Sequence, residues 1–158
     1  MRNRRSISSR GFSLIELVIV VVIIAIIGAI AIPRMSRGAA GAADSALTGN
    51  LSVLRSAIDL YQTEHGGTFP TAATIEPQLT QYSDTTGATN QAKGGAYIYG
   101  PYIRKVPPLP VGARKGQTGI GTADGPTIGW IYEEATGNIK ANTTATEKDD
   151  SGKLYSDY

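Results

Sequence analysis

The sequence predicts an α+β protein in which one long N-terminal α-helix packs, through its C-terminal half, on a small antiparallel β-sheet head. Three observations predict this fold. A continuous apolar run ends at Ile32, an apolar stripe with helical spacing occupies residues 47–61, and residues 128–142 alternate between apolar and polar side chains. These are the periods of a helix and of half-buried strands. The apolar half of the helix has no predicted cover in the chain and is expected to be an exposed stalk.

Residues 12–32 are apolar or glycine, interrupted only by Ser13 and Glu16. As a helix, these 21 residues cover about 30 Å, which is the thickness of the hydrocarbon core of a bilayer. Four arginines precede the segment: Arg2, Arg4, Arg5 and Arg10. The positive-inside rule therefore places the N-terminus in the cytoplasm and residues 34–158 outside it.

Glu16 distinguishes between interpretations of this segment. A secretory signal cleaved after Ala31 has an apolar region of only about 7 to 15 residues and no carboxylate. A plain signal anchor explains the length but not Glu16, which costs about 3 kcal/mol in the hydrocarbon. The carboxylate either reaches the lipid headgroups or pairs with a positive charge.

The residues from Arg10 to Leu17 read RGFSLIEL and are followed by the apolar run and Pro33. This segment resembles the N-terminal signature of the type IV pilin superfamily, which includes the pseudopilins of type II secretion. The resemblance covers about residues 10–34. It implies that prepilin peptidase cleaves between Gly11 and Phe12 and methylates the new amine of Phe12. The apolar segment then stays in the mature protein.

The resemblance also implies that Glu16 pairs with the Phe12 amine of a neighbouring subunit and so sets the register of a filament. Cleavage removes four of the 15 basic side chains and none of the 13 acidic ones, so the side-chain balance becomes −2. A nucleic-acid-binding protein would need a persistent basic face, and we therefore predict no nucleic-acid partner.

We divide the chain into a cleaved basic leader (1–11), a transmembrane and filament-core helix (12–33), an amphipathic helix (34–65) and a globular β head (66–158). Gly28 and Pro33 weaken the helix between them, where a kink or local melting is expected. We assign both to filament assembly, together with Phe12 and Glu16.

The amphipathic helix has apolar residues at steps of three and four: Leu47, Leu51, Leu54, Ile58 and Tyr61. This spacing predicts a face packed against the head. Residues 39–43 are small and suit close helix packing. Gly66-Gly67 is expected to end the helix.

The head is predicted to contain a short helix or irregular segment in 74–82, with Ile75 and Leu79 facing inward. Residues 128–133 and 138–142 predict a β-hairpin around a turn. The glycine-rich segment 119–125 is interpreted as a turn, because its spacing departs from the dinucleotide-binding fingerprint. Residues 143–158 either add a last strand or remain loose.

The sequence contains no cysteine and one histidine, which excludes a disulfide framework, a thiol nucleophile and a histidine pair. His65 lies at a helix end, where an imidazole commonly meets carbonyl groups, so we predict no catalytic residue and no enzyme. No metal site or cofactor is predicted. Calcium, bound by the heads of many major pseudopilins, is the alternative, with four aspartates as oxygen ligands: Asp84, Asp124, Asp149 and Asp150.

The resemblance implies a structural subunit of a helical filament, most similar to a major pseudopilin that drives type II protein secretion. The similarity to this subclass lies in three segments of the head: Gly66–Thr71, Gly129–Tyr132 and Thr136–Ile139. In addition, the chain has no cysteine and so lacks the disulfide that is common in pilus subunits. The implied partners are other copies of the chain, prepilin peptidase, minor pseudopilins, an inner-membrane assembly platform with its ATPase, and membrane lipid before assembly. The implied location of the precursor is the bacterial inner membrane, with the N-terminus in the cytoplasm and the head in the periplasm. After assembly, the implied location is a periplasmic or extracellular filament. The alternatives are a type IV pilus major pilin, a membrane-anchored binding module and a small secreted enzyme.

Overall fold

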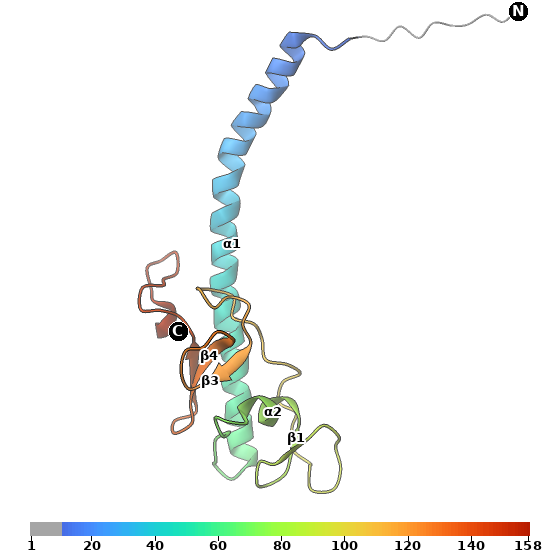
Figure 1. Ribbon diagram of the computed structural model, residues 1–158, viewed down its shortest axis with the longest axis vertical. Helices are drawn as coiled ribbons and strands as arrows, with labels where there is room; N and C mark the ends of the chain where they lie inside the picture. Colours follow the sequence, from blue (N-terminus) through green and yellow to red (C-terminus); the bar gives the residue numbers. More distant parts are fainter. Residues whose placement is uncertain (1–10) are drawn as a thin grey trace, which may run out of the picture. The chain divides into compact units, whose positions relative to one another are not determined.

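The computed structural model describes residues 11–158, except for the side chains of residues 31–37. The chain divides into two compact units, Met1–Gly38 and Ala39–Tyr158. One long helix is followed by short helices and strands, so the predicted α+β class is confirmed. Figure 1 shows this order along the chain.

Helix α1 runs from Leu14 to Glu64 and is continuous through Gly28 and Pro33. The prediction of local melting there was wrong. Pro33 lacks one N–H donor, but the hydrogen bonds of the flanking turns remain intact. The helix ends where Gly66 takes a φ of +66°. The Gly67 amide then donates to the Gln62 carbonyl at 2.8 Å, which is the six-to-one bond of a Schellman cap.

The part of α1 in the second unit buries the predicted stripe. Its five apolar residues are at most 2% exposed: Leu47, Leu51, Leu54, Ile58 and Tyr61. They share one core with Trp130 and Ile139 of the sheet. The apolar spacing of the sequence therefore identifies the helix face that the head covers.

The main sheet has three strands in the order β3 (Gly119–Gly121), β4 (Ile128–Glu133) and β5 (Asn138–Ala141). Strands β4 and β5 form the predicted hairpin, with Tyr132 opposite Ile139. The Trp130 indole donates to the Pro107 carbonyl at 2.8 Å, and the Tyr132 hydroxyl donates to the Pro70 carbonyl at 2.8 Å. These bonds satisfy the polar tips of two buried aromatic residues.

Strand β3 was interpreted as a turn and pairs instead in parallel with β4, so the sheet is mixed. Close backbone approach requires a glycine on each of the two strands. A Cβ on Gly119 of β3 would lie 2.6 Å from the Thr127 carbonyl oxygen, and one on Gly129 of β4 would lie 2.3 Å from that of Gln117. Ile120 is the buried residue of this strand, at 7% exposure, and it pairs with Trp130 of β4.

Helix α2 (Ile75–Thr80) buries Ile75 and Leu79, as predicted. The second sheet pairs β1 (Tyr82–Ser83) with β2 (Thr89–Asn90) in antiparallel orientation. The C-terminal segment adds an isolated bridge between Lys148 and Leu154 and the 3-10 helix η1 (Tyr155–Asp157).

Candidate processing and assembly site

The residues of the expected cleavage site lie in an exposed, non-helical segment directly before α1. Gly11 and Phe12 have no regular secondary structure, and Phe12 is 83% exposed. The Gly11–Phe12 bond therefore lies outside the helix, and both of its residues are exposed. Residues 1–10, including the four arginines of the expected leader, lie outside the described residues.

Ser13 and Glu16 form a cap at the start of α1. The Ser13 carbonyl accepts the first helical bond, from the Leu17 amide at 3.2 Å. The Glu16 carboxylate accepts from the Ser13 amide at 2.9 Å. This is half of a capping box, and the spacing Ser-x-x-Glu was a signal that our sequence analysis did not use. Glu16 therefore satisfies an N–H that the helix itself leaves without a partner.

The helix beyond Glu16 is apolar and exposed. From Leu17 to Ile30 no charged side chain occurs, and the large apolar side chains are 45–63% exposed. Gly28 lies within this stretch, and a Cβ added to it would meet no atom within 4 Å. Its own chain therefore does not require glycine there. Pro33 belongs to α1, but its side chain lies outside the described residues.

Within residues 11–30 and 38–158, where side chains are described, no helix is both long and apolar enough to cross a membrane.

His65 is 7% exposed and sits at the C-terminal end of α1. Its Nδ1 lies 2.9 Å from the Tyr61 carbonyl oxygen and its Nε2 lies 2.9 Å from that of Asp84. The ring stacks on Tyr61 with a centroid distance of 3.8 Å. The Ser83 hydroxyl, 3.1 Å from Nε2, is itself fully buried. These contacts join α1 to β1, which is a structural role.

The four aspartates considered as calcium ligands are not brought together. Among the described residues, no group of three or more acidic or histidine side chains has the geometry of a metal site. Three of the four, Asp84, Asp124 and Asp149, accept hydrogen bonds from other side chains. The carboxylate of Asp84 accepts from the Thr86 hydroxyl at 2.7 Å, and this bond lowers the pKa of Asp84.

Asp124 forms a two-bond ion pair with Arg114, at 2.9 and 2.8 Å, and also accepts from the Asn142 amide at 2.9 Å. The Arg114 bonds hold the pKa of Asp124 at about 2. Asp149 accepts from the Tyr158 hydroxyl and from Ser151, which likewise hold its pKa at about 2. The carboxylates of Asp84, Asp124 and Asp149 thus already have hydrogen-bond partners.

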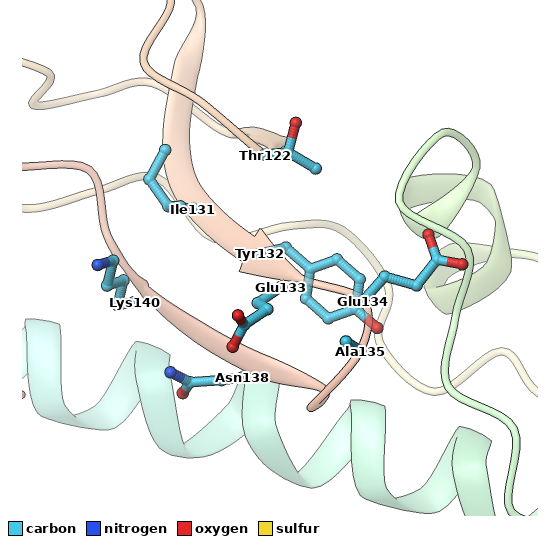
Figure 2. Close-up of a pocket in the computed structure, with 8 residues that line it drawn as sticks. All are labelled: Thr122, Ile131, Tyr132, Glu133, Glu134, Ala135, Asn138 and Lys140. Atoms are coloured by element: carbon cyan, nitrogen blue, oxygen red, sulfur yellow. The ribbon is translucent and has the colours of Figure 1, made fainter.

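The head has an open hollow of about 470 Å³ beside the β4–β5 hairpin, shown in Figure 2. Its carboxylates are engaged in structural bonds. Glu134 accepts from the Ala72 amide at 2.8 Å, and Glu133 accepts from the Thr136 hydroxyl at 2.6 Å. Lys140 comes from the neighbouring strand. This arrangement provides no nucleophile with an adjacent base.

One of three comparisons with known proteins matches the N-terminal segment of the chain. The family model described as the prokaryotic N-terminal methylation motif matches residues 7–32. No curated protein matches the chain, and no solved structure matches it. The motif covers Gly11, Phe12, Glu16 and the exposed apolar helix up to Ile32, and it indicates that the chain is a type IV pilin-like precursor.

Proposed function

We propose that the chain is a structural subunit of a helical pseudopilus that drives type II protein secretion. One observation carries the proposal. The methylation motif covers the expected cleavage bond Gly11–Phe12, which lies just before a helix whose first 17 residues contain one charged side chain, Glu16, and expose their large apolar side chains. Such a surface needs either lipid or other copies of the helix as its cover.

Processing changes the electrostatics of the helix start. Cleavage creates an ammonium group at Phe12, and methylation preserves its charge. That cation opposes the positive end of the helix dipole, whereas the Glu16 carboxylate suits it. In a filament, the carboxylate of one subunit neutralises the ammonium of the next, and two charges are buried as a pair. In the precursor, Glu16 caps Ser13 instead.

The proposed life cycle is the one that the resemblance to type IV pilins implies. The precursor is held in the bacterial inner membrane by the apolar helix, with its N-terminus in the cytoplasm and its head in the periplasm. Prepilin peptidase removes residues 1–11. An inner-membrane platform and its ATPase then move subunits out of the lipid into a filament that also contains minor pseudopilins.

A type IV pilus is the second candidate for the same subunit. The head favours a pseudopilus, because its C-terminal segment is closed by side-chain hydrogen bonds in a chain without cysteine. Deletion of the gene distinguishes the two filaments. Loss of protein secretion with surface appendages retained supports the pseudopilus, and the reverse phenotype supports the pilus.

The mass of the intact mature protein tests the proposal. We expect loss of residues 1–11 and the gain of one methyl group. Gly11→Leu places a large side chain at the cleavage bond and should leave the chain uncut, whereas Gly28→Ala should be processed normally. An uncut wild-type chain would support a membrane-anchored binding module, and loss of residues 1–31 would support a secreted protein.

A further inference from the structure

A calcium ion in the head would need several free oxygen atoms at one place, because calcium takes about six to eight oxygen ligands. Two acidic side chains, Asp124 and Glu147, line one open hollow of about 430 Å³, whose other walls come from residues 113–114 and 142–144. The fit of calcium to this hollow depends on whether the two carboxylates have oxygen atoms to offer.

Both oxygen atoms of the Asp124 carboxylate already face a positive charge. Arg114 donates to Oδ1 through Nε at 2.9 Å and to Oδ2 through Nη2 at 2.8 Å. The side-chain amide of Asn142, a residue that is 6% exposed, donates to the same Oδ1 at 2.9 Å and to the Ile128 carbonyl oxygen at 2.7 Å. A guanidinium group thus lies where a metal ion would have to approach Asp124.

The Glu147 carboxylate is engaged by backbone amides. Its Oε1 accepts from the Ala113 amide at 2.5 Å, and its Oε2 accepts from the Thr144 amide at 2.7 Å. A Cβ on Gly112 would lie 3.1 Å from both oxygens, so the glycine lets the chain pass close to this carboxylate. Among the described residues, the only buried side-chain nitrogen or oxygen without a hydrogen-bond partner is Thr143 Oγ1. One neutral oxygen and two engaged carboxylates do not fit calcium.

The turn around Asp149 is also closed by the protein's own groups. The Asp149 Oδ1 accepts from the Ser151 hydroxyl at 2.7 Å and from the Lys153 amide at 2.8 Å. Its Oδ2 accepts from the Tyr158 hydroxyl, and the Lys153 ammonium lies 3.8 Å from the centre of the Tyr158 ring. Both oxygens of this carboxylate therefore have donors within the segment.

We propose that Arg114 is the cation that holds the C-terminal part of this head together, and that the head therefore folds without calcium. The guanidinium joins its own loop to Asp124 in the β3–β4 connection, and Asn142 joins that carboxylate to the segment after β5. Arginine suits this role because its planar fork makes two parallel bonds to one carboxylate. The inference rests on the proposed function, since it takes a pseudopilin-like head as its setting.

The exposure of the pair separates this arrangement from a calcium site. The side chains of Arg114 and Asp124 are 34% and 62% exposed. Salt screens such a pair, because the Debye length is only about 3 Å at about 1 M ionic strength. The contribution of Arg114 should therefore fall in high salt and should not change with chelators, whereas a head held by calcium would lose stability in EDTA.

Thermal unfolding of the full chain in detergent tests the proposal. The wild-type midpoint should be the same in EDTA and in calcium chloride. Arg114→Gln should lower the midpoint by about 2 to 4 °C at low salt, and this difference should shrink at about 1 M sodium chloride. Arg114→Lys, which keeps the charge but not the fork, should be intermediate. Lys115→Gln is the matched control, because Lys115 is exposed and has no ion pair among the described residues, and it should not change the midpoint.

A higher wild-type midpoint in calcium than in EDTA, or one calcium ion retained per chain after dialysis, would overturn the proposal. Equal midpoints for Arg114→Gln and Lys115→Gln, or a difference that salt leaves unchanged, would also overturn it. None of these measurements requires filaments. Absence of filaments from wild-type cells would therefore contradict the proposed function and not the role of Arg114.

Discussion

The Tyr155 hydroxyl donates a hydrogen bond of 2.9 Å to the Asp44 carboxylate, across 111 positions of the sequence. Arg55 adds a bond of 2.5 Å to the Tyr158 carbonyl oxygen, and the Lys153 ammonium lies 3.8 Å from the centre of the Tyr158 ring. The first two of these contacts connect the end of the described chain to α1. We call these contacts the C-terminal clasp.

Tyr155→Phe removes the hydroxyl but keeps the ring, and it should lower the free energy of unfolding by about 1 kcal/mol, the usual contribution of one hydrogen bond. Urea unfolding of the full chain in detergent measures the change. Ser156→Ala is the control, because the Ser156 hydroxyl bonds only to the adjacent Asp157 among its described contacts. Equal stability of Tyr155→Phe and wild type would show that the Tyr155–Asp44 bond contributes nothing to stability.

Acid should weaken the second unit between about pH 4 and pH 2. The pKa values of Asp124 and Asp149 lie at about 2, below the ordinary value of 3.8, so both carboxylates favour the folded state when ionised. That stability is fully present above pH 4 and is lost as the pH falls through the folded pKa. Unfolding measured from pH 6 to pH 2 should show the loss, and Asp124→Asn should flatten it. A pH-independent wild type would contradict this assignment.

Alanine substitution of two glycines with positive φ, Gly137 and Gly152, distinguishes the effect of a steric clash from the effect of backbone strain. A Cβ on Gly137 (φ +69°) would lie 2.2 Å from the Phe69 ring, whereas one on Gly152 (φ +90°) would meet nothing within 4 Å. Both alanine variants force a left-handed residue, which costs about 1 kcal/mol or more. Gly137→Ala should therefore lower the thermal midpoint further than Gly152→Ala does. The opposite order would show that Phe69 moves away freely.

His65→Gln should destabilise the head by about 1 to 2 kcal/mol, because it removes a stacked ring and at least one buried hydrogen bond. The sequence alone gave us no reason to expect this cost. Filaments should still form below the lowered melting temperature. Loss of filaments or secretion with unchanged stability would instead indicate a chemical role for the imidazole.

The long helix and the hairpin could be predicted because their patterns are local. Leu47 to Tyr61 repeats with helical spacing over four turns, and the alternation around Trp130 allows only one buried face. Strand β3 could not be predicted, since a three-residue strand with Ile120 as its only apolar side chain has no period. Its parallel pairing with β4 depends on the fold around it.

The same distinction between local and distant contacts applies to the candidate site. The motif residues Gly11, Phe12 and Glu16 lie within six positions of one another, whereas the C-terminal clasp is made by residues that are far apart in the sequence. The contact between Tyr155 and Asp44 could not be predicted from the sequence, because a tyrosine hydroxyl can donate to many different acceptors. The role of Glu16 as a cap was present in the Ser13 to Glu16 spacing and follows from the same local geometry.

Substitution of Glu16 separates its two roles. Glu16→Val loses both the cap and the charge, whereas Glu16→Gln keeps an oxygen that can accept from the Ser13 amide and loses only the charge. Insertion into the membrane should improve in Glu16→Val, by about 3 kcal/mol on insertion scales. In a filament, either variant leaves the Phe12 ammonium unpaired, and removing one partner of a buried pair costs about 3 to 5 kcal/mol.

The most direct measurement is the amount of filament sheared from cells that carry wild type, Glu16→Val or Glu16→Gln, with N-terminal mass analysis of the membrane fraction. We predict that all three precursors are inserted and cut after Gly11, and that only the wild type forms filaments in normal amount. Glu16→Asp should be intermediate, because its shorter side chain reaches less far. A wild-type yield of filaments from Glu16→Gln would contradict the charge pairing on which the proposed assembly depends.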